Sequence, residues 1–205
     1  MTIKVNGVVD SSKTVMLLST KQNGVSVSPT NVSPVLSSVL TVTLESTYPE
    51  TLTVDSLSVA LVKQTDVSVT RPLYVISVDD AAKTIKIKYP GADSGDYFVQ
   101  VTSKSIGRID KSQLALKVYG KVTNFSPLSG SALGGTLVTI DGENFSTDPL
   151  DNPVKVGKQY CLVETSTPTQ IVCRTMETGS VTEVPDAELI VFLRTSEEAQ
   201  SDVPT

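Results

Sequence analysis

The chain has 205 residues, enough for one or two domains that each bury a core. Its net charge of −5 argues against nucleic acid as a partner, because an acidic chain is repelled by phosphate backbones. It contains no His, which excludes catalytic sites built from Ser, His and Asp or from Cys and His. No apolar run reaches the roughly 18–20 residues that span a bilayer, so we expect no direct membrane insertion of this segment.

The first 24 residues hold two short strand-like segments, 3–5 and 15–18. They are too short to form a domain. We expect them either to add edge strands to the unit that follows or to be the remnant of a preceding repeat. No basic segment followed by an apolar stretch opens the chain. The chain is then either a cytosolic protein or a fragment of a longer one, and we favour the fragment.

Residues 25–118 alternate apolar and polar side chains, the pattern of half-buried strands. In 84–89, for example, Ile85, Ile87 and Tyr89 share one face and two lysines take the other. Short strands at intervals of about 8–12 residues are typical of a β-sandwich or barrel. The expected strands of this unit are 39–44, 57–61, 84–89, 97–101 and 114–118.

Residues 119–195 repeat the pattern, with expected strands at 136–140, 154–156, 160–163, 171–175 and 189–193. Pro29 and Pro127 precede the two series and lie 98 positions apart, close to the length of about 100 residues of an immunoglobulin-like unit. The predicted fold is all-β, with two tandem immunoglobulin-like β-sandwiches. Only Gly120 interrupts the junction, so we expect the units to dock with little freedom. The polar, acidic residues 196–205 are expected to be a disordered tail or a linker.

Cys161 and Cys173 are the only cysteines. They are either a disulfide or two buried free thiols. A zinc site lacks the usual four nitrogen or sulfur ligands, and we expect no metal and no cofactor.

In the first unit, Asp93, Gly95 and Tyr97 precede a strand and resemble the tyrosine corner of immunoglobulin-like domains. The resemblance implies that the Tyr97 hydroxyl bonds to nearby backbone. It also places Val99 where such domains carry a cysteine, so that an apolar contact replaces the disulfide. The alternative is an ordinary acidic turn before a strand.

The second unit resembles the IPT/TIG family of immunoglobulin-like domains. The resemblance covers about 60 residues and rests on a set of motif positions: Pro127, Gly134, Gly135, Gly142, Phe145, Gly157, Cys161 and Cys173. It implies that Cys161 and Cys173 pair across neighbouring strands. Domains of this family occur in plexins, the hepatocyte growth factor receptor, fibrocystin-like ciliary surface proteins, microbial surface proteins and some transcription factors. The first unit lacks the Gly-Gly-Thr motif and both cysteines, so it is at most a divergent relative.

Three further groups of residues are candidates for chemistry. Asp79 and Asp80 could form an acid pair, although adjacent carboxylates at a strand end favour a solvated turn. Another cluster could ligate Ca²⁺ but is also typical of surface turns: Asp148, Asp151 and Asn152. The last group comprises three potential N-glycosylation sites, of which we favour the first: Asn31, Asn124 and Asn144.

We predict no catalytic activity. The favoured hypothesis is a structural or adhesive repeat segment of a large extracellular or cell-surface protein. Its partners would be other proteins, in particular copies or neighbouring segments of its own parent. The alternatives are a receptor module that binds a ligand, favoured by a large apolar surface patch, and an accessory module of a secreted carbohydrate-active enzyme, favoured by an exposed aromatic row. A cytosolic transcription factor is the weakest alternative because the chain is acidic.

Overall fold

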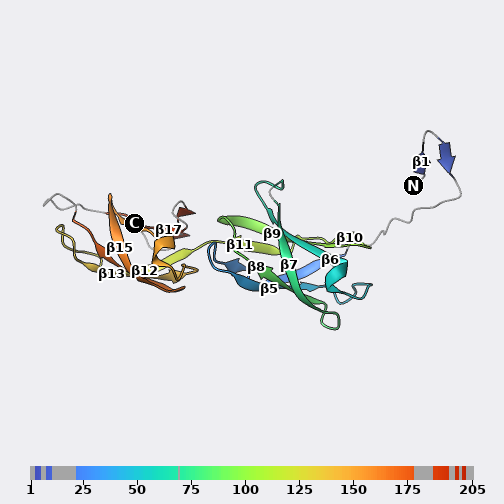
Figure 1. Cartoon of the computed structure of the whole chain (residues 1–205), viewed down its shortest axis with the longest axis horizontal. Helices are drawn as coiled ribbons and strands as arrows, with labels where there is room; N and C mark the ends of the chain where they lie inside the picture. The colour runs from blue at the N-terminus through green and yellow to red at the C-terminus, as the bar shows by residue number, and fades with distance from the viewer. Residues whose placement is uncertain are drawn as a thin grey trace.

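The computed structural model describes residues 3–5, 8–10, 22–68, 70–177, 187–193, 197–198 and 200–201. These residues form strands and turns, with two 3-10 helices of three residues each, η1 (Val54–Ser56) and η2 (Pro149–Asp151). Figure 1 shows two sandwiches end to end, one coloured from blue to green and the other from yellow to red. The prediction of two tandem immunoglobulin-like β-sandwiches is therefore confirmed. Within the described ranges, no helix has the length and apolar character needed to cross a membrane.

The strands of the first sandwich hydrogen-bond in the order β3-β5-β8-β7-β6-β9-β11-β4, with β10 on β9. All of these pairs are antiparallel except β11 with β4. The strands are β3 (Gly24–Ser28), β4 (Asn31–Val32), β5 (Ser38–Leu44), β6 (Leu57–Lys63), β7 (Thr70–Asp79), β8 (Thr84–Tyr89), β9 (Gly95–Ser103), β10 (Gly107–Arg108) and β11 (Ala115–Val118).

Strand β7 links the two layers of this sandwich. Its first half pairs with β6 from Thr70 to Leu73, and its second half pairs with β8 from Tyr74 onward. The sequence patterns did not single out β7, which contains Pro72. The pairing of β7 with β8 begins only after Pro72. The N–H group that proline lacks therefore costs no hydrogen bond to β8.

The alternation read from the sequence decides which side chains enter the first core. Ile85, Ile87 and Tyr89 are fully buried, as are Leu40 and Val42 of the neighbouring strand. Each fully buried aliphatic side chain stabilises the fold by about 1.5–3 kcal/mol relative to exposure. The first core therefore depends on the alternation of apolar and polar residues along its strands.

The second sandwich has the strand order β18-β17-β14-β15-β16-β13-β12-β19. Its core surrounds Phe145, which is fully buried together with Ile140, Val154 and Ile171. The first hydrophobic cluster ends at Val118 and the second begins at Val122. The strands are β12 (Lys121–Ser126), β13 (Leu137–Glu143), β14 (Val154–Val156), β15 (Gln159–Ser166), β16 (Gln170–Thr175), β17 (Leu189–Leu193), β18 (Glu197–Glu198) and β19 (Gln200–Ser201).

Short strands occur at both ends of the chain. Strands β1 (Ile3–Val5) and β2 (Val8–Asp10) form a two-stranded sheet of their own and join no edge of the first sandwich. The expected strand at 15–18 lies outside the described residues. At the other end, β18 pairs with β17 and β19 pairs with β12, so some of the residues that we expected in a disordered tail or a linker extend the second sheet.

A tyrosine ties the loop before β9 to the first sandwich. The Tyr97 hydroxyl donates a hydrogen bond to the backbone oxygen of Asp93, 2.9 Å away. Gly95 between them has a φ of 148°, which suits glycine. Val99, at the position where immunoglobulin-like domains carry a cysteine, is fully buried. The geometry is the one that the resemblance implies.

Replacing Tyr97 with Phe removes this hydrogen bond while retaining the buried ring. We expect the free energy of unfolding to fall by about 1 kcal/mol, measured by urea denaturation followed by circular dichroism. Tyr74→Phe is the matched control, because Tyr74 is 71% exposed and the same change there should have little effect. Equal destabilisation by the two changes would contradict a role for the corner.

Candidate functional site

The most distinctive arrangement of polar groups lies where the sandwiches meet. Only Tyr119 and Gly120 separate β11 from β12. The Tyr119 N–H donates to the Val32 oxygen of the first sandwich, 3.2 Å away. A Cβ on Gly120 would clash with Leu193, which is fully buried in the second sandwich. The connecting residues are therefore held on both sides.

Asn144 bridges the linker and both sandwiches. Its side-chain Nδ2 donates to the Tyr119 oxygen at 3.0 Å. Its backbone oxygen accepts a hydrogen bond from the Ser33 hydroxyl of the first sandwich at 2.8 Å. Asn144 has a φ of 64°, the left-handed conformation that Asn tolerates better than most residues. One residue thus connects three segments.

Ser33 is fixed by the first core. It is 5% exposed, its hydroxyl accepts from the Val35 and Leu36 N–H groups, and its backbone oxygen accepts from the Tyr89 hydroxyl at 2.9 Å. Sequence reasoning missed Ser33 and Tyr119 as junction residues. No local pattern could have found them, because the bond between Ser33 and Asn144 joins positions 111 residues apart.

A small cavity of about 190 Å³ opens beside this junction. Neutral side chains line it, among them Asn31, Ser37, Ser38 and Asn144. Its volume is below the roughly 300–1,000 Å³ of typical small-molecule sites. The junction is therefore better suited to holding the two sandwiches together than to binding a substrate.

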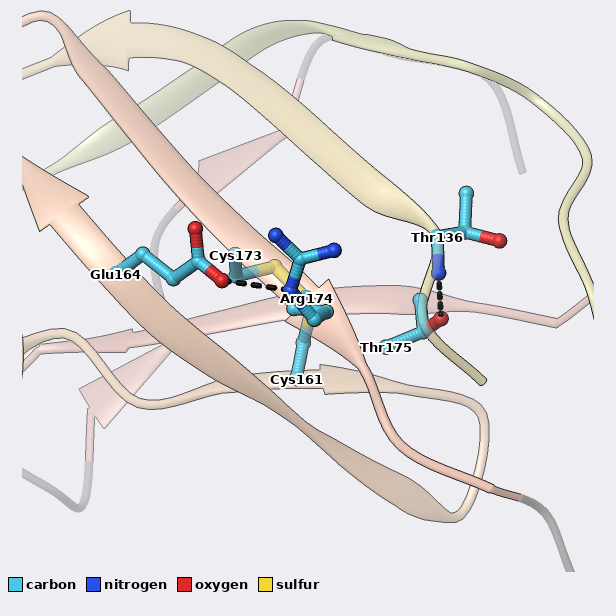
Figure 2. Close-up of a disulfide and its surroundings, with 6 residues drawn as sticks. All are labelled: Thr136, Cys161, Glu164, Cys173, Arg174 and Thr175. Atoms are coloured by element: carbon cyan, nitrogen blue, oxygen red, sulfur yellow. Dashed lines mark hydrogen bonds and ion pairs between the residues drawn. A yellow bond between two sulfur atoms is a disulfide. The ribbon is translucent and has the colours of Figure 1, made fainter. Parts of the chain in front are cut away.

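The two cysteines form a disulfide between neighbouring strands of the second sandwich (Figure 2). In the register, Cys161 on β15 lies opposite Thr175, and Val163 lies opposite Cys173 on β16, so the bridge is diagonal. The two Cα atoms are 5.5 Å apart, and both side chains are buried. The Arg174–Glu164 ion pair at 2.7 Å spans the same strands. The disulfide pairing that the resemblance implied is confirmed.

The remaining motif residues of the second sandwich lie in its turns or, for Gly142, within β13. Pro127 follows β12, and its peptide bond with Ser126 is cis. A Cβ on Gly134 would come within 2.7–2.9 Å of the backbone at 175–177. A Cβ on Gly142 would clash with the Lys121 oxygen and the Phe145 ring. Gly135 and Gly157 both have positive φ.

The residues considered as a calcium cluster are engaged in hydrogen bonds within their own loop. Asn152 is fully buried and bonds with Ser146 backbone atoms and the Ser166 hydroxyl. Asp151 accepts from the Ser146 hydroxyl, and Asp148 caps η2 by accepting from the Leu150 N–H. No group of three or more potential metal-ligating His, Cys, Asp or Glu residues occurs within the described part of the chain. These contacts favour the surface-turn interpretation.

The hydrogen bonds of Asp79 and Asp80 also favour a turn over an acid pair. Asp79 accepts from the Ala82 N–H at 3.0 Å. Asp80 accepts from the Leu52 N–H and from Lys83 Nζ, and these two bonds lower the pKa of its carboxyl group. A carboxyl group whose pKa is lowered is ionised at neutral pH and is poorly suited to act as a general acid.

The three sequons differ in accessibility. Asn124 is exposed on β12. Asn31 is half-buried, and its Oδ1 is buried without a hydrogen-bond partner. The Nδ2 of Asn144, the atom to which a glycan would attach, is bonded to Tyr119. Asn124 is therefore the most exposed of the three asparagines, whereas the sequence favoured Asn31.

These features define an all-β protein of two immunoglobulin-like sandwiches joined by a hydrogen-bonded junction. Residues 121–187, which lie in the second sandwich, match the model of the IPT/TIG domain family.

Human fibrocystin-L is 34% identical over 87 residues, covering 42% of this chain and 2% of that protein. Fibrocystin of Canis lupus familiaris is 31% identical over 106 residues, covering 51% of this chain and 2% of that protein. The chain thus spans about 2% of the length of the curated relatives it matches.

Two solved structures are similar at low sequence identity. The plexin A4 full extracellular region is 13% identical with a TM-score of 0.34, covering 88% of this chain and 27% of that one. A structure described as being with a xylogluco-oligosaccharide is 16% identical with a TM-score of 0.47, covering 91% of this chain and 40% of that one.

Replacing Asn144 with Ala removes the bond to Tyr119 and places Ala at positive φ. We expect the docked arrangement to weaken by about 1 kcal/mol or more, which is about a fivefold rise in the undocked population. ¹⁵N relaxation checks this, because the two sandwiches should then tumble less as one body. Asn124→Ala is the matched control at an exposed position outside the junction. Unchanged tumbling in the Asn144 variant would refute the bridging role.

Reducing the disulfide should destabilise the second sandwich selectively. The bridge links positions 12 residues apart, for which loop entropy gives about 3 kcal/mol. Amide hydrogen exchange of the oxidised and reduced chain measures this effect. Amides in the first sandwich, which contains no cysteine, provide the internal control. Two thiols that alkylate in folded protein taken from an oxidising compartment would contradict the bridge.

Proposed function

We propose that this chain is a non-catalytic structural segment of a large extracellular or cell-surface protein, in which it holds a fixed spacing and makes protein–protein contacts. Its units would be an immunoglobulin-like sandwich at 25–118 and an IPT/TIG sandwich at 119–195. The observation that carries the proposal is the bonded junction, in which Asn144 contacts the linker and Ser33. A stiff connection lets weak contacts along successive units add, because little entropy is lost when they bind together.

The disulfide supports an oxidising compartment, since such bonds persist mainly in secreted and cell-surface proteins. The similarity to fibrocystin-L and fibrocystin, each matched over about 2% of its length, supports a segment of a much larger protein. Two observations argue against catalysis. The chain has no His, and hydrogen bonds in turns engage its candidate carboxylates, those of Asp79, Asp80, Asp148 and Asp151.

A carbohydrate-binding accessory module is less well supported. In the described ranges, the aromatic side chains among the exposed large hydrophobic residues are Tyr74 and Tyr160, one on each sandwich. Two isolated tyrosines do not form the aromatic row that would favour this alternative. A receptor module gains more support, because both sandwiches carry exposed large apolar side chains.

The test uses the intact parent protein, purified from secreting cells and treated with a lysine-reactive cross-linker. We expect cross-links from Lys155 or Lys158 to other polypeptides or to distant segments of the parent. The same measurement on a parent lacking residues 1–24 shows whether that segment takes part. Cross-links confined to this segment, with a monomer in light scattering, would leave only the role of a passive spacer.

A further inference from the structure

The two sandwiches can be compared position by position. Val42 in β5 and Ile140 in β13 lie 98 positions apart, and both are fully buried. In register, each is paired with an isoleucine that is also fully buried, Ile85 on β8 and Ile171 on β16. Strands β5 and β13 are therefore equivalent, and the residues just before them can be matched at the same offset.

At this offset, Ser131 of the second sandwich is the counterpart of Ser33. The Ser33 hydroxyl accepts a hydrogen bond from the Val35 N–H at 3.2 Å. The Ser131 hydroxyl accepts one from the Leu133 N–H, also at 3.2 Å. Ser33 is the residue that donates to the Asn144 backbone oxygen at the junction. The turn that holds the junction serine in the first sandwich is thus repeated in the second.

The chain also runs through the two sandwiches in the same way. Strand β11 is parallel to β4 and leads into the junction, and β19 is parallel to β12. Because β12 begins at the junction and β13 ends there, the loop between them lies at the opposite end of the second sandwich (Figure 1). Strand β19 therefore runs toward the end that holds Ser131. A unit that followed β19 would emerge beside this serine.

The matched residues differ in exposure. Ser33 is 5% exposed, whereas Ser131 is exposed. Val35 is half-buried, whereas its counterpart Leu133 is 67% exposed, and nearby Leu128 is 82% exposed. We call residues 128–133 the distal loop. Large exposed apolar side chains beside an exposed hydroxyl are typical of an interaction site.

The partner of the distal loop must present a backbone oxygen as Asn144 does, from a residue with a φ near 64°. A separate copy of this chain does not offer one. Its own Asn144 is bonded to its own Ser33. Its first sandwich does not repeat this feature after β5, because the positive-φ residues other than glycine in the described ranges are Lys83 and Asn144. The partner that fits is a further sandwich of the same type as the second.

We propose that the distal loop docks a third sandwich of this type, which follows β19 in the parent chain. The Ser131 hydroxyl donates to the backbone oxygen of the residue that corresponds to Asn144. Leu128 and Leu133 become covered, as Val35 is at the first junction. This inference rests on the proposed function, since it requires a longer parent, and it names both the interface and the partner.

Hydroxyl-radical footprinting read by mass spectrometry, on the intact parent and on the 205-residue chain, tests the docking. We expect oxidation of Leu128 and Leu133 to be at least about twofold lower in the parent, because side chains inside an interface lose contact with water. Leu150 is the matched control, since it is 81% exposed and lies outside the distal loop. Oxidation of Leu128 and Leu133 that is equal in the two proteins overturns the inference.

A pair of variants of the parent separates docking from other causes of protection. Leu133→Asp should restore the oxidation of Leu128, whereas Leu150→Asp should not. Both leucines are exposed, so both variants should fold, which circular dichroism verifies. Continued protection of Leu128 in the Leu133 variant contradicts the inference.

A photoreactive benzophenone side chain in place of the exposed Ser129 identifies the partner. We expect a cross-link to the unit that follows residue 205 in the parent. A cross-link to a different polypeptide overturns the choice of partner. If the distal loop is unprotected while Lys155 or Lys158 still cross-links to other polypeptides, the docking fails and the proposed function stands. The two failures are therefore distinguishable.

Discussion

The two-residue connection between β11 and β12 is the constraint on which the arrangement of this molecule depends. Tyr119 and Gly120 are too short a linker to separate the sandwiches, so loops from both must meet around them. Buried backbone groups at such a meeting need hydrogen-bond partners. Asn144 and Ser33 satisfy them, and the connection becomes a bonded junction.

The same requirement explains the polar residues that first suggested chemistry. A loop that leaves β13, crosses the end of the sandwich and enters β14 carries several N–H and C=O groups away from water. Asn152, fully buried, pairs with the backbone and with Ser166, and Asp148 and Asp151 complete the loop. Carboxylates and amides in loops serve both structural and metal-binding roles, and the fold uses these three for structure.

The two sandwiches stabilise their cores by different means. In the first, Val99 is buried where a cysteine could stand, and Tyr97 fastens the adjacent loop. In the second, a disulfide links β15 to β16, and the hydrophobic cluster formed by the described residues is smaller. A smaller core gains more from a covalent link, because less apolar surface is available to offset chain entropy. The bridge also sets the inward direction of Cys161, which turns Tyr160 and Leu162 outward.

By itself, the sequence determined the all-β class, most strand positions, the inward residues of β8, and the IPT/TIG motif of the second unit. These follow from period-two alternation and turn residues, which act within a few positions of the chain. Only the tertiary structure decided that Asn144 bridges the junction and that Asn152 holds its loop. It also decided that residues 197–198 and 200–201 extend the second sheet and that Leu162, Arg174 and Leu137 lie side by side. These features join positions far apart in the chain, and hydrogen bonding and packing over such separations leave no local pattern to read.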